Sequence, residues 1–280
     1  MTHKIIVPSP DGHGYAMAYA EAGAGAPVVM LHGTLGDQRY WAPQMAPLGE
    51  RFRAIAPSLR HYWPERWAGP TAAAPSGFTI AQHVADVAAF ITALGAGPVR
   101  LVGHSRGGHI AFRVAEQYPA LLHSLVLAEP GGERDETLGG APVTSGQGRQ
   151  AAAFAAAATL VRNGDIEGGL RLVAEHTGGP GAWDSRTEDR KAINRDNAAT
   201  LLGQIHEQRA PFSRAAAEAI RLPTLLVGGA RTLPAFVANL DALERTIVGA
   251  RRVTIPDAAH CMSDDNPAAF NAAVLEFLRA

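Results

Sequence analysis

The stretch Val99–Gly108, VRLVGHSRGG, places one serine between two glycines where a strand is expected to meet a helix. Its apolar start predicts a short buried strand, and Ala111–Tyr118 predicts a helix that ends before Pro119. Between them, Gly103–Gly107 fits the G-x-S-x-G nucleophile elbow, a strained turn that presents the Ser105 hydroxyl above the edge of a sheet. Glycine is needed on both sides because a side chain there would collide with neighbouring backbone. The stretch therefore predicts a strand–turn–helix unit built around a nucleophilic serine.

The composition of the chain narrows the class of protein. The 280 residues are 47% hydrophobic and 18% charged, with a formal net charge of −1. This length allows one large α/β domain with a sizeable core and an inserted subdomain. The near-neutral charge provides no basic footprint for nucleic acid or an anionic membrane, and no segment reaches the roughly 20 apolar residues of a membrane helix. The one cysteine, Cys261, excludes an internal disulfide and suits a reducing compartment, so a cytoplasmic location is expected.

Strand and helix patterns alternate along most of the chain. Expected strands cover residues 4–7, 15–21, 28–31, 52–56, 99–102, 124–128, 223–228 and 252–255. Expected helices cover residues 38–48, 79–94, 111–118, 235–247 and 267–278. Continuous apolar runs such as VVML at 28–31 are typical of strands buried on both faces of a parallel sheet.

The alternation is interrupted after the strand that ends at Ala128. No strand pattern occurs between Glu133 and Leu222, and helices are expected over 150–162, 165–176 and 186–208. A helical cap over a ligand crevice explains this insertion most economically. We therefore expect a core domain of residues 1–132 and 221–280 and a helical cap of residues 133–220.

Several polar and aromatic residues follow strands, at the sheet edge where open α/β sheets carry their ligand crevice. The turn His32-Gly33-Thr34 leaves backbone N–H groups free to face a ligand, although it is also compatible with a simple glycine-rich turn. Tyr62 and Trp63, in the loop after residues 52–56, either line a pocket or anchor that loop. Trp183, in the expected cap, either reaches the pocket or fastens the cap.

His260 lies in a loop a few residues after the last expected strand. The elbow requires a base, and a histidine that follows the serine in this order can supply it. With these residues, the chain resembles the α/β-hydrolase fold superfamily over essentially its whole length. The residues that carry the resemblance are the HG turn at 32–33, GHSRG at 103–107 and DAAHCM at 257–262.

The resemblance implies an α/β-hydrolase fold, with a mostly parallel eight-stranded sheet, helices on both faces and a cap inserted after strand 6. It also implies that Ser105 is the nucleophile and that His260 is the general base and later the general acid. The backbone N–H groups of Thr34 and Arg106 would form the oxyanion hole. Because position 105 is serine and not aspartate, haloalkane dehalogenase and epoxide hydrolase chemistry is disfavoured.

The acid of the triad departs from the commonest pattern of this superfamily. Most relatives place an aspartate after the strand that is TLLVG here, yet residues 228–234 contain no carboxylate. The chain is similar to some dehalogenases and to the zearalenone lactonases in having a glutamate, Glu129, at the end of the neighbouring strand. We expect Glu129 to orient His260 and to stabilise its imidazolium form. The alternative is that Glu129 caps a helix or pairs with the cap, and that Asp257 or Asp241 serves instead.

Together these residues predict a cofactor-independent serine hydrolase of carboxylic esters or lactones. The candidate pocket walls Tyr62, Trp63, Phe154 and Trp183 suit a moderately apolar small molecule. A metal site is not expected, because the histidines show no H-x-H or H-x-x-x-H pair. The alternatives are carbon–carbon bond hydrolysis of diketone-like substrates and a small-molecule receptor on the same fold. The sequence leaves the oligomeric state open.

Overall fold

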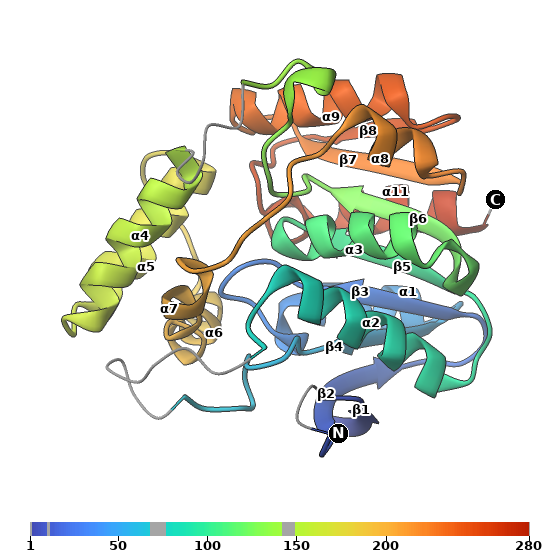
Figure 1. Ribbon diagram of the computed structural model, residues 1–280, viewed down its shortest axis with the longest axis horizontal. Helices are drawn as coiled ribbons and strands as arrows, with labels where there is room; N and C mark the ends of the chain where they lie inside the picture. Colours follow the sequence, from blue (N-terminus) through green and yellow to red (C-terminus); the bar gives the residue numbers. More distant parts are fainter. Residues whose placement is uncertain (1, 10–11, 68–76, 142–148, 280) are drawn as a thin grey trace.

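A computed structural model describes residues 2–9, 12–67, 77–141 and 149–279. Its centre is an eight-stranded sheet with the order β1-β2-β4-β3-β5-β6-β7-β8 (Figure 1). The strands are β1 Thr2–Val7, β2 Tyr15–Ala22, β3 Pro27–Leu31, β4 Arg53–Pro57, β5 Val99–His104, β6 Leu122–Ala128, β7 Thr224–Gly229 and β8 Arg251–Ile255. All eight expected strands are present, with ends that differ by no more than two residues.

The directions and register of the strands bring distant residues to one edge of the sheet. β2 pairs antiparallel with both β1 and β4. All further neighbours in the sheet, from β4 through β3 and β5 to β8, pair parallel. His104 in β5 lies opposite Ala128 in β6, which in turn lies opposite Val227 in β7. The residues that follow β5 and β6, Ser105 and Glu129, therefore leave the sheet side by side. The predicted fold class, a mostly parallel eight-stranded sheet between helices, is confirmed.

Apolar side chains form a separate cluster on each face of the sheet because successive strand residues point to opposite faces. In β3, Val29 and Leu31 belong to one cluster, and Val28 and Met30 belong to the other. The first cluster is covered by α2 Ile80–Leu94, α3 Arg106–Gln117 and α9 Pro234–Thr246, and the second by α1 Ala42–Gly49 and α11 Pro267–Arg279 (Figure 1). The VVML run is therefore apolar throughout because both of its faces are buried.

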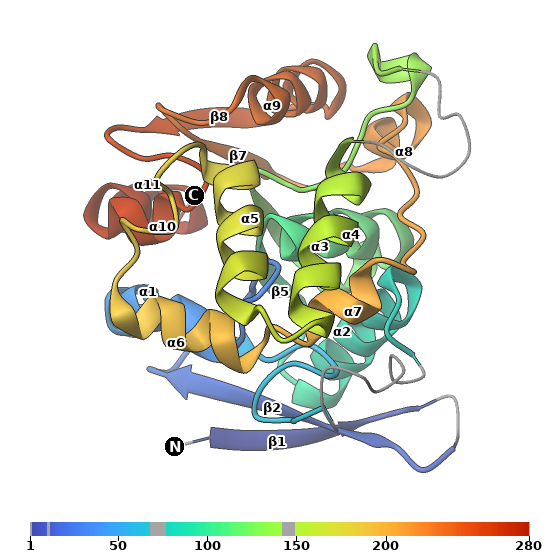
Figure 2. The same cartoon turned by 90° about the vertical axis from the view of Figure 1, so that its left-hand side faces the viewer.

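A helical insertion follows β6. It consists of α4 Arg149–Arg162, α5 Ile166–Gly178, α6 Glu188–Asp196 and α7 Thr200–Gln204. These four helices lie beyond the carboxyl ends of the parallel strands, at the left of Figure 1 and facing the viewer in Figure 2. Phe154, Trp183 and Leu201 pack in an apolar cluster of the insertion that also includes Leu35 from the loop after β3. The next helix, α8 Arg214–Ala219, packs instead with α3 and α9.

The single helix expected over 186–208 is wrong, since the chain forms α6 and α7 with a break between them. Asn197 ends α6 with non-helical backbone angles, φ −106° and ψ 6°. Its side-chain amide donates to Asp37 (2.7 Å) and its side-chain oxygen accepts from the Trp63 backbone N–H (2.8 Å). The residues that Asn197 contacts lie far away in the sequence, so the periodicity of apolar residues does not indicate the break.

Two expected features fall partly on residues that the structure does not describe. Residues 10–11 lie in the expected hairpin turn and residues 142–148 in the expected cap, and both segments are outside the described residues. Among the helices that are described, none is both long and apolar enough to cross a membrane.

Candidate active site

Ser105 occupies a strained backbone conformation at the junction of β5 and α3. Its φ of 52° and ψ of −118° lie in a region that residues with a side chain rarely adopt. Two backbone hydrogen bonds keep Ser105 in this conformation. Its N–H donates to the Ala128 carbonyl (3.0 Å), and its own carbonyl accepts from Gly131 N–H (2.8 Å). Strain of this kind costs on the order of 1–3 kcal/mol and is typical of functional turns.

The glycines around Ser105 are required by close backbone contacts. A Cβ at Gly103 would lie 2.4 Å from the Gly107 carbonyl oxygen. A Cβ at Gly107 would lie 2.4 Å from the carbonyl oxygens of both Leu31 and His32. Real Cβ atoms do not approach backbone this closely, so the steric reason given for the elbow pattern is confirmed.

His260 and Glu129 form a buried pair at the same edge of the sheet. The Nδ1 of His260 lies 2.7 Å from the Oε2 of Glu129, and both side chains are almost fully buried. Glu129 also accepts hydrogen bonds from Gly229 N–H (2.8 Å) and from the Thr232 hydroxyl (2.7 Å). The carboxylate is thus held by the last residue of β7 and by the loop after it, which lacks a carboxylate of its own.

Of the two alternative acids, Asp241 is paired with Arg252 and Asp257 is exposed. An ionised carboxylate only accepts hydrogen bonds, so the Nδ1 of His260 donates to Glu129. In the neutral imidazole, Nε2 is then the nitrogen without a proton, which is the tautomer that a general base needs.

His260 is linked to the elbow through His104, the residue before Ser105. The Nε2 of His104 donates to the His260 carbonyl (2.8 Å), and its ring stacks on Tyr40 with centroids 5.1 Å apart. Burial, and secondarily the nearby His260, lower the pKa of His104 well below its usual range, so it is neutral. In the described part of the chain, no hydrogen bond joins the Ser105 hydroxyl directly to the His260 imidazole.

Phe236 stacks on the His260 ring, with centroids 4.0 Å apart and planes inclined by 16°. It projects from α9 and is half-buried. Neither Phe236 nor Thr232 forms part of a sequence motif, so neither could be predicted as a site residue. Their only signal in the sequence is a position shortly after β7.

The predicted oxyanion donors flank the serine. A Cβ at Gly33 would lie 3.0 Å from the Ser105 Cβ, so the turn that contains Thr34 lies directly against the nucleophile. Arg106 is the first residue of α3, and the first N–H groups of a helix have no partner within it. His32 supports this turn: its Nε2 accepts from Leu59 N–H (3.0 Å), which leaves Nδ1 to donate to the Gly33 carbonyl (2.9 Å).

The side chain of Arg106 is fully buried. It forms an ion pair with Glu207, and its Nη2 donates to the Nδ1 of His83 (2.9 Å). The guanidinium also faces the rings of Tyr62 and Phe78, 5.8 and 5.2 Å from their centroids. Burial, followed by the Arg106 charge, lowers the pKa of His83 well below its usual range, so that side chain is neutral.

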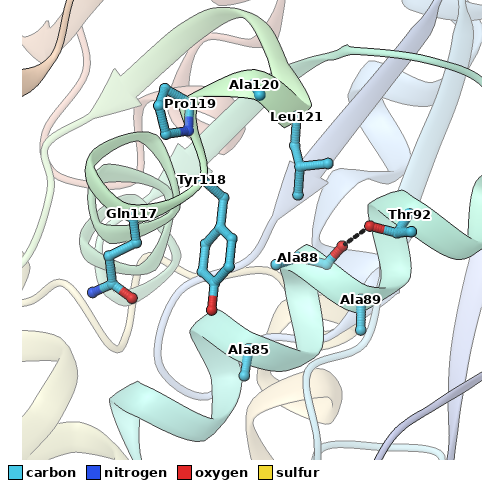
Figure 3. A pocket seen from close by; sticks show the side chains of 9 residues that line it. All are labelled: Ala85, Ala88, Ala89, Thr92, Gln117, Tyr118, Pro119, Ala120 and Leu121. Atoms are coloured by element: carbon cyan, nitrogen blue, oxygen red, sulfur yellow. Dashed lines mark hydrogen bonds between the residues drawn. The ribbon is translucent and has the colours of Figure 1, made fainter.

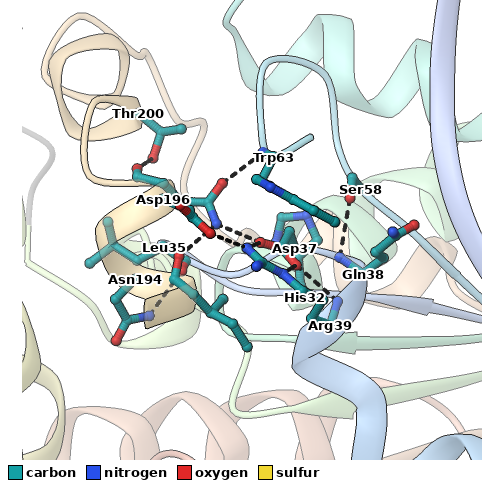
Figure 4. A network of polar contacts seen from close by, with 12 residues as sticks. His32, Leu35, Asp37, Gln38, Arg39, Ser58, Trp63, Asn194, Asp196 and Thr200 are labelled. Atoms are coloured by element: carbon teal, nitrogen blue, oxygen red, sulfur yellow. Dashed lines mark hydrogen bonds and ion pairs between the residues drawn. The ribbon is translucent and has the colours of Figure 1, made fainter. Parts of the chain in front are cut away.

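A polar network joins the insertion to the loop after β3 (Figure 4). Asn194 donates to the Leu35 carbonyl (2.9 Å), and Asn197 donates to Asp37 (2.7 Å). Arg39 pairs with both Asp37 (2.7 Å) and Asp196 (2.9 Å). The α6 end of the insertion is therefore tied to the loop that begins with the predicted oxyanion turn.

The four predicted pocket residues occupy different environments. Tyr62 is buried and packs edge-on against His32, with centroids 4.7 Å apart. Trp63 is half-buried beneath the Arg39 guanidinium, which lies 3.8 Å from its ring centroid. Phe154 and Trp183 lie in the apolar cluster of the insertion. Tyr62 therefore anchors its loop, and a contact between any of these side chains and a substrate remains a prediction.

A surface pocket lies away from this site, at the opposite end of α3 (Figure 3). It is lined by Ala85, Ala88, Ala89, Thr92, Gln117, Tyr118, Pro119, Ala120 and Leu121. These side chains include no nucleophile–base pair, so the pocket offers no alternative to the elbow. Among the described residues, no three histidine, cysteine, aspartate or glutamate side chains converge in a way that could hold a metal ion.

A sheet of this topology with a serine elbow and a His–acid pair at its carboxyl edge defines an α/β-hydrolase. The chain belongs to the Alpha/beta hydrolase family, whose model matches residues 28–273.

Comparisons with individual proteins agree with this assignment. A putative non-heme bromoperoxidase, BpoC, from Mycobacterium tuberculosis is 37% identical over 121 residues, which cover 42% of this chain and 44% of that protein. A malate-bound esterase structure from Thermogutta terrifontis is 25% identical, covers 100% of this chain and 98% of its own, and has a TM-score of 0.78. An enol-lactonase structure from Burkholderia xenovorans LB400, 22% identical over 95% of this chain and 97% of its own with a TM-score of 0.72, shares the fold. The aligned parts span only 32% to 44% of the curated relatives' own lengths.

Proposed function

We propose that this protein is a serine hydrolase that cleaves carboxylic esters or lactones of moderately apolar small molecules through an acyl-enzyme intermediate. The observation that carries the proposal is the strained Ser105 turn at the sheet edge that also holds the buried His260–Glu129 pair. A serine hydroxyl is a weak nucleophile until an adjacent base removes its proton, and this arrangement supplies that base.

In the proposed first half-reaction, the Ser105 oxygen attacks the carbonyl carbon while His260 takes the hydroxyl proton. The electron pair of the carbonyl moves to its oxygen, which the N–H groups of Thr34 and Arg106 stabilise. Each such donor is worth about 3 kcal/mol in the transition state. When the tetrahedral intermediate collapses, the bond to the leaving oxygen breaks and His260 gives its proton to that oxygen. The acyl group then remains on Ser105.

In the second half-reaction, His260 removes a proton from water, and the resulting hydroxide attacks the acyl carbon. His260 returns the proton to the Ser105 oxygen, and a carboxylic acid leaves. In a lactone the alcohol stays attached, so the product is a hydroxy acid. Glu129 keeps the Nδ1 proton of His260 in place and stabilises the imidazolium that forms twice in each cycle.

We assign the helical insertion as a cap over the substrate, within a cap range of residues 133–220 set in a core of 1–132 and 221–280. The supporting observations are its position beyond the strand ends and its hydrogen bonds to the loop after β3 (Figures 2 and 4). In this proposal Tyr62, Trp63, Phe154 and Trp183 shape an apolar pocket beneath it. The partner is a small molecule, no cofactor takes part, and the location is cytoplasmic.

The proposal is tested with a panel of short esters, lactones and vinylogous diketones on the wild-type protein and on Ser105→Ala. We expect ester or lactone hydrolysis by the wild type and its loss in a folded Ser105→Ala variant. Faster cleavage of the diketones would favour carbon–carbon bond hydrolysis instead. Binding without turnover of any panel member would favour a receptor.

A further inference from the structure

One cationic side chain lies beside the nucleophile turn without a role in the proposed triad. A Cβ built on Gly131 would lie 3.4 Å from Nη1 of Arg209. The same Cβ would lie 3.3 Å from the carbonyl carbon of Ser105 and 3.5 Å from the backbone nitrogen of Arg106. The Arg209 guanidinium therefore approaches the elbow on the side of the predicted oxyanion donor.

The segment that carries Arg209 is fixed to α3 and is not a free loop. Nη2 of Arg113 donates to the carbonyls of Ala210 (2.8 Å) and Pro211 (2.7 Å). The next side chain, Phe212, is fully buried and packs edge-on against Phe112, with centroids 4.9 Å apart. The backbone thus holds Arg209 at the elbow at little additional entropic cost when a ligand binds.

The charges around Arg209 do not balance. In the part of the chain that the structure describes, Glu207 is the one carboxylate that pairs with both Arg106 and Arg209, and its side chain is 2% exposed. Burial alone would raise the pKa of Glu207, but the charges of Arg106 and Arg209 together hold it below its usual range, so it is ionised. Burial, together with neighbouring arginine charges, lowers the pKa of the adjacent His109 well below its usual range, so it is neutral and adds no charge. Among the described residues, one positive charge beside the nucleophile therefore has no carboxylate of its own.

We place the unpaired positive charge on Arg209, the more exposed of the two arginines. Arg106 is completely buried, whereas the Arg209 side chain is 18% exposed. Arg209 uses Nη2 to bind Glu207 (3.0 Å), and within the described residues it forms no second ion pair. A guanidinium can bind a carboxylate with two parallel donors, and Arg209 retains donors on its side facing Gly131.

We infer that Arg209 binds a carboxylate of the substrate, so that the preferred substrates are esters or lactones whose acyl part carries a negative charge. This inference rests on the proposed function. The nearness of Arg209 to the elbow places that carboxylate a few bonds from the scissile carbonyl, as in a half-ester of a short dicarboxylic acid. Binding neutralises a charge that the fold leaves half-buried, and the charge-assisted hydrogen bonds orient the acyl group.

The test compares monoethyl glutarate with ethyl pentanoate, which has the same chain length but a methyl group in place of the carboxylate. The measured quantity is the ratio of kcat/KM for the charged ester to that for the neutral ester. We expect Arg209→Gln to lower this ratio about 10- to 100-fold, the range for a lost hydrogen bond to a charged group. Arg209→Lys should retain part of it. The matched control is Arg214→Gln, which removes an exposed arginine from the same segment and should leave the ratio unchanged.

A second variant separates substrate binding from a structural role. Glu207→Gln removes the competing carboxylate, so we expect the ratio to rise, opposite to the effect of Arg209→Gln. Should both variants lower the ratio together, Arg209 only holds Glu207 in place and the inference is wrong. Thermal unfolding of each variant establishes that it is folded.

The failure of this inference differs from the failure of the proposed function. If the wild type hydrolyses ethyl pentanoate and Arg209→Gln leaves the ratio unchanged, the proposed hydrolase function is retained but the inference that Arg209 binds a substrate carboxylate is wrong. If the wild type hydrolyses neither these esters nor the wider panel, the proposed function itself falls. A binding measurement in the Ser105→Ala variant, with monoethyl glutarate as the titrant, reports the Arg209 contact without turnover. There, Arg209→Gln should raise Kd about 10-fold or more.

Discussion

At the scale of single residues, the site depends on how Glu129 reaches His260 from a strand that does not usually carry the acid in this superfamily. Glu129 itself has a φ of 40°, which turns the chain sharply at the end of β6. Its carboxylate accepts from three donors, including Gly229 N–H at the end of β7 and the Thr232 hydroxyl of the loop that follows. The loop after β7 therefore positions an acid that the neighbouring strand supplies.

We expect Glu129→Gln to lower kcat about 10³- to 10⁴-fold with little change in KM. An amide at this position cannot stabilise the imidazolium and can favour the wrong tautomer of His260. Steady-state kinetics on an ester substrate measure the effect. Asp257→Asn, a matched change at an exposed carboxylate in the His260 loop, should have no effect. A loss below 10-fold in Glu129→Gln would contradict the assignment of the triad acid.

Phe236 provides a second residue-scale prediction. Its ring lies face to face with the imidazole, at a distance where an aromatic ring attracts a cation. We expect Phe236→Leu to lower kcat about 2- to 5-fold, because a stabilisation of about 0.5–1 kcal/mol of the imidazolium is lost. Phe236→Tyr should restore the rate. An equal loss in the leucine and tyrosine variants would contradict a contribution of the aromatic ring to the stability of the imidazolium.

At the scale of elements, the position of the proposed cap depends on a few polar side chains of α6. Asn197 joins the helical insertion to both Asp37 and the Trp63 backbone. Removal of a buried amide that makes such contacts costs about 1–3 kcal/mol. We therefore expect Asn197→Ala to increase local opening of the insertion, with proteolytic cleavage within residues 149–204 about 10-fold faster.

Limited proteolysis followed by mass spectrometry of the fragments measures this opening. Asn163→Ala, which changes an exposed asparagine in the turn between α4 and α5, is the control and should be cleaved like the wild type. If Asn197→Ala accelerates cleavage equally in the sheet domain, the contact stabilises the whole fold and not the docking of the insertion.

The elements differ in how well the sequence predicts them. The strands could be predicted because burial on both faces gives continuous apolar runs, as in VVML at residues 28–31. The elbow could be predicted because a side chain at either of its glycines would collide with backbone, which restricts the sequence of this turn to a recognisable motif. The break between α6 and α7 could not, because Asn197 ends the helix with partners at Asp37 and Trp63. Thr232, Phe236 and Arg209 were missed for the same reason, since only tertiary contacts bring them to the site.

At the scale of the whole molecule, four buried histidines link folding to pH. Burial is the largest cause of a lowered pKa at His32, His83, His104 and His109, and for His32 the pKa falls from 6.5 to about 4. Between these values the unfolded chain binds protons that the folded chain does not. The free energy of unfolding therefore falls as the pH is lowered from about 6.5 towards 4.

His32 alone accounts for about 3 kcal/mol of this loss once the pH reaches its folded pKa. We expect Tm to fall steeply between pH 6.5 and pH 4, and unfolding near pH 5 to take up several protons. Calorimetry in buffers of different ionisation enthalpy measures both quantities. A Tm that stays constant over this range would show that these histidines become protonated without unfolding.

The central claim concerns the whole molecule, because residues from three distant parts of the chain must act on one substrate carbonyl. The most direct test is covalent labelling with a fluorophosphonate, followed by mass spectrometry of the digested protein. Our account predicts one label per chain, on Ser105, that is abolished in Ser105→Ala and strongly slowed in Glu129→Gln. A folded wild-type protein that remains unlabelled, or that is labelled at another residue, would contradict it.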